Sequence, residues 1–339
     1  MENLRLVGDL MAKRHIKLFR YYKEWISVWK SQKIRDVTYV KYEQVQRWLK
    51  ENAPDLYLDK LTRTDVQKIV NKYGETHELE TVKDFLHHIQ APLRDAAYEG
   101  WVARDPTYKV VASSQVKHKA TRQMYLEVDE VQRLEKVLKK HYHPIADMCD
   151  FDLRTGLRFA EVLGLTPADV DFDKHTVYVN KTWNYKAGCD SDFMETKNKY
   201  SHRVITIDSQ AEDDLRRNMF GVSKSEPIFV KRWTSWKMTH RTRPPRKRFK
   251  KYVAIHNATI DSYLSRLCKE AKVPRVTFHN LRHTHASLLI ANGVSIQSVA
   301  KRLGHADTTT TQKTYIHLLD EMREKDNRQI VKIMDGLGD

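Results

Sequence analysis

Cysteine, glycine and proline are all scarce in this chain of 339 residues. Its three cysteines, Cys149, Cys189 and Cys268, are too few and too widely spaced for a disulfide framework or a zinc site. Only 11 glycines and 9 prolines, beside 40% hydrophobic residues, exclude a collagen-like, linker-dominated or disordered chain. We therefore expect a globular protein that works in a reducing compartment.

Long apolar runs are missing as well. No stretch approaches the ~18 apolar residues that a helix needs to cross a bilayer. Residues 1–5 do not begin the apolar core of a signal peptide. We expect a soluble, cytoplasmic protein without membrane association, and the length suggests two domains.

Basic residues are what the chain has in excess. There are 60 Lys and Arg against 44 Asp and Glu, a net charge of +16, and ten of these positive charges lie without any acid in Lys231–Lys251. Trp233, Trp236 and Phe249 are interleaved with them, a pattern typical of contact with a nucleic-acid backbone. A solvated loop is the alternative for this run. We expect an anionic partner, with Arg246, Lys247 and Arg248 on its phosphates.

Apolar residues recur at helical spacing through the first part of the chain. This spacing predicts helices at residues 15–31, 36–49 and 79–98. A further helix is expected to end near Gly74, with either Thr62 or Thr64 as its N-terminal cap. Pro92 is expected to break or kink the helix 79–98. No strand pattern of comparable length appears, so we predict an all-helical domain over residues 15–110 after a short extension, 1–14.

Residues 111–122 show no sustained hydrophobic periodicity and contain more basic than acidic residues. We interpret them as an interdomain linker whose Lys117 and Lys119 lie along an anionic surface. Beyond the linker, helices are expected at 128–140, 146–153, 257–271, 280–292, 295–303 and 319–334.

Two segments of this second domain alternate as strands do, 176–180 and 203–207, and a hairpin could join them. The fold class predicted for the chain is therefore mainly α with a small antiparallel β-sheet (α+β). Its second domain covers residues 123–339 and ends in the helix 319–334.

One expected helix carries His279-Asn-Leu-Arg282-His283. Histidines at i and i+4 are typical of zinc proteases, but that motif needs a Glu after the first His, and Asn280 stands there. We therefore expect no metal site. His279 and Arg282, at i and i+3, share a helix face, where they can bind phosphate oxygens and offer a proton acceptor.

Two further segments accompany this one in a fixed order. Thr155-Gly-Leu-Arg158-Phe-Ala-Glu161 precedes it, and Leu303-Gly-His305 follows, with Tyr315 ten residues beyond His305. Together the three resemble the tyrosine recombinase (phage integrase) family, whose pattern is T-G-L-R-x-x-E, H-x-L-R-H, L-G-H and a Tyr ten residues on. The resemblance is clear over residues 123–320, and the N-terminal helices are less specifically similar to the family's core-binding domain.

The resemblance implies a SAM-like core-binding domain and a catalytic domain that form a C-shaped clamp on DNA. It implies a catalytic set of Arg158, Lys197, His279, Arg282, His305 and the nucleophile Tyr315. The residue types suit metal-free cleavage of a phosphodiester, which needs neutralised phosphate charge, a nucleophile and an acid for the leaving oxygen. No cofactor is expected.

Two assignments within this set leave alternatives open. The family's T-K-x-x-x-S-x-R segment matches residues 196–203, which makes Lys197 the general acid. Lys199 competes with it, since residues two apart lie on the same face of an extended strand. Glu161 is expected either to orient Arg158 or to form a simple exposed ion pair with it. Gly156 and Gly164 are expected to have backbone roles, a tight approach near the phosphate and a helix end.

The resemblance further implies a site-specific recombinase that integrates, and excises, a phage or mobile element through a 3′-phosphotyrosyl intermediate and a Holliday junction. Its partners would be double-stranded attachment sites, three further copies in a homotetramer, and an accessory excisionase or DNA-bending protein. The helix 319–334 would dock on a neighbouring subunit or on its own domain. A type IB topoisomerase-like enzyme and a catalytically silent DNA-binding regulator are the alternative functions. The family's additional arm-binding domain is either absent or missing from a shortened chain, since about fifteen residues precede the first expected helix.

Neutralising Arg246, Lys247 and Arg248 together is predicted to weaken DNA binding and to flatten its salt dependence. The log–log slope should fall by about one unit for each phosphate that the protein no longer neutralises. Covalent chemistry at Tyr315 is expected to survive at saturating DNA. Binding titrations over a range of salt concentrations measure this. Unchanged affinity and slope would make the basic run a solvated loop.

Overall fold

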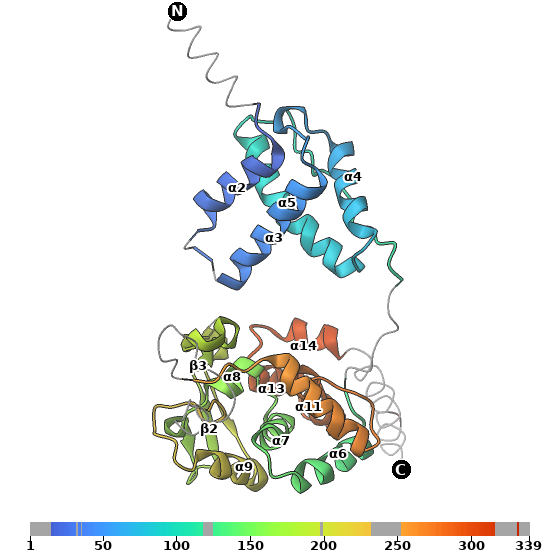
Figure 1. Cartoon of the computed structure of the whole chain (residues 1–339). Helices are drawn as coiled ribbons and strands as arrows, with labels where there is room; N and C mark the ends of the chain where they lie inside the picture. Colours follow the sequence, from blue (N-terminus) through green and yellow to red (C-terminus); the bar gives the residue numbers. More distant parts are fainter. Residues whose placement is uncertain are drawn as a thin grey trace, which may run out of the picture. The chain divides into compact units, whose positions relative to one another are not determined.

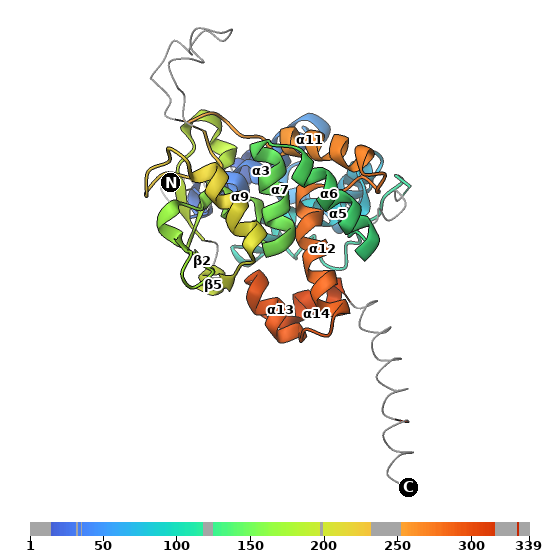
Figure 2. The same ribbon diagram turned by 90° about the horizontal axis from the view of Figure 1, so that it is seen from below.

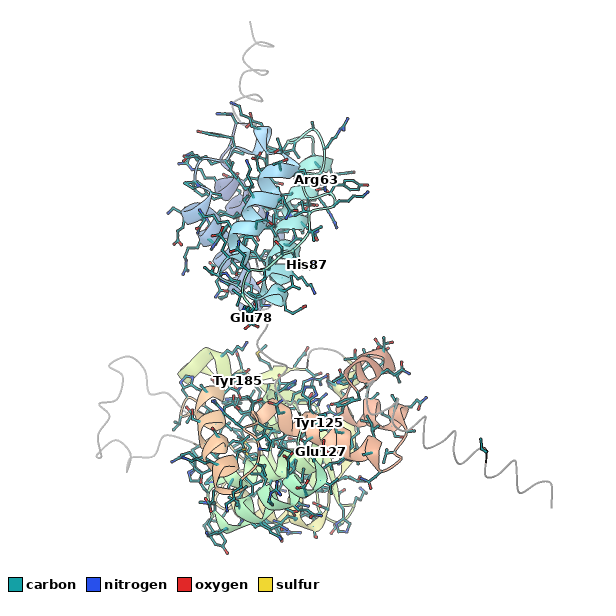
Figure 3. The ribbon with its side chains drawn as sticks, turned by 90° about the vertical axis from the view of Figure 1, so that its right-hand side faces the viewer. Arg63, Glu78, His87, Tyr125, Glu127 and Tyr185 are labelled. Atoms are coloured by element: carbon teal, nitrogen blue, oxygen red, sulfur yellow. The ribbon has the colours of Figure 1, made fainter. Side chains whose placement is uncertain are left out.

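The computed structural model describes residues 15–31, 33–34, 36–117, 125–196, 199–231, 252–315 and 331. The chain forms two compact units that divide after Arg122, each with its own buried apolar core (Figure 1). Most long polar side chains point outward from the two units, as Figure 3 shows. None of the described helices is both long and apolar enough to cross a membrane.

The N-terminal unit is helical, as predicted. Its helices are α2 (Leu18–Trp29), α3 (Asp36–Asn52), α4 (Arg63–Gly74) and α5 (Leu79–Tyr98), with a 3-10 turn at Leu58–Lys60. Thr62, rather than Thr64, caps α4: its hydroxyl accepts from the Asp65 amide, and the Asp65 carboxylate accepts from the Thr62 amide.

Helix α5 runs through Pro92 without the break that the sequence suggests. A proline has no amide proton, so the carbonyl of His88, four residues earlier, loses its helical donor. The hydroxyl of the fully buried Tyr22 on α2 donates to that carbonyl at 3.1 Å instead. The Tyr21 hydroxyl donates to the carbonyl of Pro92 itself at 3.0 Å. Helix α2 thus satisfies the backbone that the proline leaves unpaired.

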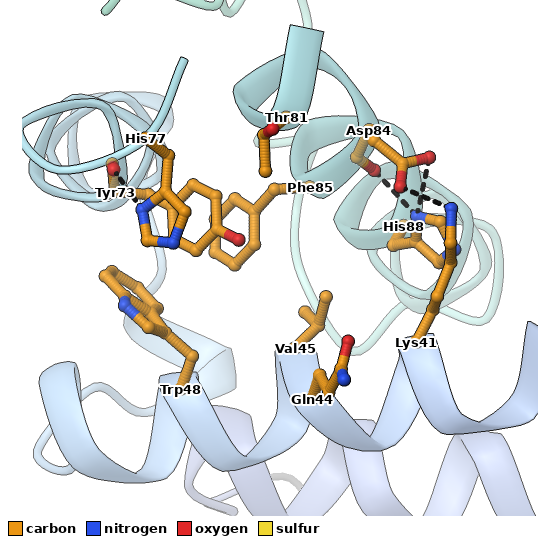
Figure 4. A pocket seen from close by; sticks show the side chains of 10 residues that line it. All are labelled: Lys41, Gln44, Val45, Trp48, Tyr73, His77, Thr81, Asp84, Phe85 and His88. Carbon is orange, nitrogen blue, oxygen red and sulfur yellow. Dashed lines mark hydrogen bonds and ion pairs between the residues drawn. The ribbon is translucent and has the colours of Figure 1, made fainter. Parts of the chain in front are cut away.

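An aromatic cleft of about 440 Å³ lies between α3, α4 and α5 (Figure 4). Tyr73 stacks between Phe85 and His77, with ring centroids 3.8 Å apart on both sides. Trp48 of α3 meets the edges of this stack, and an ion pair of Lys41 with Asp84 (2.8 Å) joins α3 to α5. These contacts fix α3 against the other two helices.

The segment predicted as the start of the linker belongs to the N-terminal unit. The Gln67 side chain exchanges two hydrogen bonds with the backbone of Val111, at 2.8 and 3.0 Å, and the Gln115 amide donates to the Gly74 carbonyl at 2.9 Å. A Cβ on Gly74 would lie 2.0 Å from the Ser113 carbonyl oxygen, so only glycine permits this approach. Residues 111–115 therefore pack along α4.

The C-terminal unit is built around one buried helix, α7 (Pro144–Thr155). Helices α6, α9, α11 and α12 pack on it, as Figure 2 shows from below. The helices of the unit are α6 (Val128–Lys140), α8 (Phe159–Gly164), α9 (Ser209–Met219), α11 (Asn257–Glu270), α12 (Phe278–Ala291), α13 (Ile296–Leu303) and α14 (Thr308–Thr314). Predicted helices correspond to α6, α7, α11, α12 and α13, while α8, α9 and α14 were not predicted.

The strands form two small antiparallel sheets instead of one hairpin. Strand β2 (Thr176–Val179) lies between β1 (Val170–Asp171) and β5 (Arg203–Thr206), with Val177 opposite Ile205. The connection from β2 to β5 contains a second sheet, β3 (Lys181–Trp183) with β4 (Phe193–Glu195). The two predicted strands thus lie side by side and antiparallel, and the connection that could have been a simple hairpin contains a second sheet.

Several predicted features lie outside the described residues: the extension 1–14, Lys119, Lys197, the basic residues Arg246, Lys247 and Arg248, and all of the helix 319–334 except residue 331. Lys117 is described and exposed.

Replacing Tyr22 by Phe removes only the hydroxyl and leaves the buried His88 carbonyl without its donor. We expect the free energy of unfolding in urea to fall by roughly 1–3 kcal/mol. In a Pro92→Ala background, where an amide proton is restored, the same change should cost less. A Tyr22→Phe protein as stable as the matched Tyr98→Phe variant, which alters a tyrosine that is 94% exposed, would refute this account.

Candidate active site

The residues of the expected catalytic set come from four places in the C-terminal unit. Arg158 stands at the start of α8, His279 and Arg282 lie on α12, His305 follows α13, and Tyr315 ends α14. Arg158 and Arg282 bind consecutive carbonyls and Arg282 contacts His305, while His279 contacts His283, which in turn contacts Tyr315.

Gly156 turns the chain sharply between α7 and α8. Its φ of 66° is left-handed, and a Cβ there would lie 2.5 Å from the ring of His285. Gly164 allows a close approach of α8 to β3, since a Cβ would meet the Thr182 backbone at 3.0 Å. Gly156 thus ends α7 and Gly164 is the last residue of α8, while the expected tight approach near a phosphate stays a prediction.

Arg282 is held almost entirely by main-chain carbonyls. Only 4% of the residue is exposed, and its guanidinium donates to the carbonyls of Gly156 (2.6 Å) and Leu303 (2.8 Å). Burial and the nearby Arg158 lower the pKa of Arg282 to about 10, so it stays positive at neutral pH. Its position is fixed without a carboxylate that would neutralise it directly.

Arg158 is bound beside Arg282. Its Nη2 donates to the Gly304 carbonyl at 3.0 Å, next in sequence to the carbonyl that Arg282 uses. Gly304 ends α13 with a φ of 70°, and helix C-termini carry partial negative charge, which favours cations. Consecutive carbonyls therefore hold the two guanidiniums close together, and 38% of the Arg158 side chain remains exposed.

Glu161 lies beneath this pair. It is 1% exposed, accepts from Arg158 at 2.8 Å, and accepts at 2.8 Å from a second arginine, Arg203 of β5. Burial alone would raise the pKa of Glu161, but Arg203 and Arg158 lower it to about 2. The alternative of an exposed ion pair is wrong, because Glu161 is a buried anion shared by two arginines.

Arg203 is a site residue that sequence reasoning missed. It also donates to the carbonyls of Arg302 (2.6 Å) and Ser201 (2.9 Å), so β5 is joined to the end of α13 that precedes His305. The sequence pattern could have indicated this role. Arg203 lies two residues before Ile205 and four before Ile207, so all three point to the same, inward face of an extended segment. A charge on an apolar face predicts a buried partner.

His305 has both ring nitrogens engaged. Its Nε2 lies 3.1 Å from Nη2 of Arg282, and its Nδ1 lies 2.7 Å from the Thr311 hydroxyl. Burial, Arg282 and Arg158 lower the pKa of His305 to about 4, so the ring is neutral at pH 7. An arginine can only donate, so Nε2 is an acceptor and Nδ1 carries the proton. His305 therefore donates its proton to the Thr311 hydroxyl.

Tyr315 is almost fully buried, with 3% exposed, in a small apolar cluster of α12 and α13. Burial raises the pKa of its hydroxyl to about 12, although Arg282 acts against this. The hydroxyl oxygen lies 2.9 Å from Nδ1 of His283. This second histidine of the i, i+4 pair was considered in the sequence only as a metal ligand. Within the described residues no group of three His, Cys, Asp or Glu side chains could hold a metal ion.

The two candidate lysines are not brought to the site by the described residues. Lys197 lies outside them, and of Lys199 only the backbone is described. That backbone belongs to a 3-10 turn, Lys199–Ser201, so the expected extended strand carrying both lysines on one face is wrong.

Replacing Arg203 by Ala leaves Glu161 one partner short and leaves the Arg302 and Ser201 carbonyls without donors. We expect the free energy of unfolding to fall by about 3–5 kcal/mol at pH 7. Glu161 stabilises the fold when ionised, so the loss should shrink as pH falls from about 4.5 towards 2. The exposed Arg133, in the same unit, provides the control. Equal effects of Arg203→Ala and Arg133→Ala in urea unfolding would rule out the buried pair as a support.

Comparison with known proteins identifies the family of the chain. Residues 124–322, more than half of the chain, match the sequence model of the phage integrase family. An integrase of Staphylococcus phage L54a is 26% identical over 308 residues, which cover 84% of this chain and 83% of that protein. A XerC-like tyrosine recombinase of Caldanaerobacter subterraneus subsp. tengcongensis is 25% identical over 323 residues, 85% of this chain and 76% of that protein.

Solved structures show the same fold. The Tn1549 transposon integrase in complex with a circular intermediate DNA superimposes with a TM-score of 0.73 at 17% identity, over 93% of this chain and 99% of that chain. A lambda integrase dimer bound to a core site gives 0.64 at 16% identity, over 91% and 80%. The chain belongs to the phage integrase family and is a site-specific recombinase of the tyrosine type.

Proposed function

We propose that this recombinase integrates, and excises, a phage or mobile element by cutting and rejoining double-stranded DNA through Tyr315. The observation that carries the proposal is the adjacent placement of Arg158 and Arg282 on the consecutive carbonyls of Leu303 and Gly304. Two fixed positive charges beside a tyrosine are what a phosphodiester substrate requires.

In the first step the Tyr315 oxygen attacks the scissile phosphorus while Arg158 and Arg282 neutralise the phosphate oxygens. Guanidiniums suit this role because their forked N–H donors match a pair of oxygens and stay charged. His279, exposed on the same face of α12 as Arg282, adds a phosphate contact. The arginines thus supply the positive charge that the reaction needs, and no metal ion is part of the proposal.

In the second step the bond to the 5′ oxygen breaks and Lys197 gives that oxygen a proton. The product is a 3′-phosphotyrosyl ester with a free 5′-hydroxyl. This ester conserves the bond energy of the phosphodiester, so religation to a partner strand needs no ATP. Two such rounds, through a Holliday junction in a homotetramer, complete the exchange.

Binding of the attachment sites is proposed to involve both units of the chain, in a clamp around the duplex. Lys117, Lys119 and the run at Arg246, Lys247 and Arg248 would contact its backbone. The lambda integrase has been seen as a dimer on a core site and as a tetramer on a Holliday junction, which supports the tetramer proposed here. An excisionase or DNA-bending protein would set direction, in the cytoplasm of a bacterial host.

The test is covalent trapping. On a nicked suicide substrate that loses its 5′-hydroxyl strand, the wild-type protein should form a DNA adduct resistant to denaturation, and Tyr315→Phe should form none, a loss of at least about 10³-fold because the nucleophile is gone. Tyr142→Phe, which changes a tyrosine that is 90% exposed, should trap normally.

The second part of the test uses DNA that carries paired attachment sites. Recombinant products are expected from the wild-type protein. Adduct formation that persists in Tyr315→Phe, or relaxation of supercoiled plasmid without recombinant products, would contradict the proposal.

A further inference from the structure

We propose that His283 is the base that receives the proton of the Tyr315 hydroxyl when Tyr315 attacks DNA. This inference rests on the proposed function, since it assigns a role to the residue that touches the proposed nucleophile.

His283 lies within hydrogen-bond distance of the Tyr315 hydroxyl. Nδ1 of His283 lies 2.9 Å from the Tyr315 oxygen, and the two ring centroids are 6.0 Å apart. A general base must lie within hydrogen-bond reach of the proton that it takes. With Tyr315 only 3% exposed, bulk water has little access to compete for this proton.

The other two histidines of the site are engaged elsewhere. His305 is bound on both sides, to Arg282 and to Thr311. His279, one helical turn before His283, meets the edge of the His283 ring, with centroids 4.8 Å apart. Among the imidazoles of the described site, it is His283 that forms a hydrogen bond with the nucleophile.

Protonation states agree with this role. Burial, His279 and Arg282 lower the pKa of His283 to about 4, so its ring is neutral at pH 7. Because Tyr315 keeps its proton, with a pKa of about 12, the tyrosine donates and Nδ1 accepts. A bound phosphate brings negative charge next to Arg282. This charge offsets the positive field that lowers the pKa of His283, and so makes the imidazole a stronger base.

The proton balance of the step is complete. As the Tyr315 oxygen bonds to phosphorus, its O–H bond breaks and the proton moves to Nδ1, which leaves His283 as an imidazolium. The bond from phosphorus to the 5′ oxygen breaks, and that oxygen takes a proton from the general acid. On religation the imidazolium returns its proton to the tyrosine oxygen, and the general acid recovers its own from the 5′-hydroxyl.

The experiment separates proton transfer from positioning. His283→Asn keeps a hydrogen-bond acceptor near the position of Nδ1 but cannot take up a proton at neutral pH. Single-turnover adduct formation on the suicide substrate should slow by roughly 10²–10⁴-fold. Replacing Tyr315 by 3,5-difluorotyrosine, a more acidic phenol, should restore most of this rate in His283→Asn.

His279→Asn is the matched control, one turn earlier on the same helix. It should also slow the reaction, because it removes an imidazole that binds the phosphate, but difluorotyrosine should not restore it. A His283→Asn protein that cleaves at the wild-type rate, or that difluorotyrosine does not rescue, overturns the proposal, and so does rescue confined to His279→Asn. Failure of the wild-type protein to form any adduct would instead refute Tyr315 as the nucleophile.

A second measurement needs no substitution at His283. In the wild-type protein labelled with ¹⁵N-histidine, the nitrogen shifts of His283 should be those of a neutral ring in the free protein. In the trapped phosphotyrosyl complex they should be those of an imidazolium. A ring that stays neutral in the complex contradicts the transfer.

Discussion

The buried carboxylate of Glu161 is the interaction on which the rest of the active site depends. Three guanidiniums, those of Arg158, Arg203 and Arg282, converge in a region of low exposure, where like charges repel strongly. Glu161 binds two of them directly, and main-chain carbonyls hold the third. One carboxylate cannot offset three guanidinium charges, so the cluster keeps a net positive charge that a bound phosphate would offset.

The same arrangement is expected to keep Tyr315, the proposed nucleophile, unreactive until a phosphate binds. Burial keeps the proton on Tyr315, while burial and the positive field make His283 and His305 neutral. A phosphate group beside Arg282 would offset this positive field. We therefore expect chemistry to be coupled to substrate binding by electrostatics alone, without a separate activating ligand.

The sequence predicted much of this and missed what depends on three-dimensional contact. Periodicity identified the N-terminal helices and α6, and the motifs around Arg158, Arg282 and Tyr315 predicted the candidate site. Periodicity cannot show that Tyr22 satisfies the carbonyl freed by Pro92, because the two residues meet only through packing of α2 on α5. The second sheet between β2 and β5 was missed because its strands are three residues long. Arg203 and His283 each belong to a motif that the sequence displays, but their partners lie on other elements.

The central claim, that the arginine pair acts by neutralising the scissile phosphate, is tested most directly with a methylphosphonate in place of that phosphate, since this group has no negative charge. Adduct formation should be compared for the wild-type protein and Arg158→Ala on both substrates. For Arg158→Ala we expect a loss of at least about 10²-fold on the phosphodiester and a rate close to that of the wild-type protein on the methylphosphonate. An equal loss on both substrates would contradict the central claim.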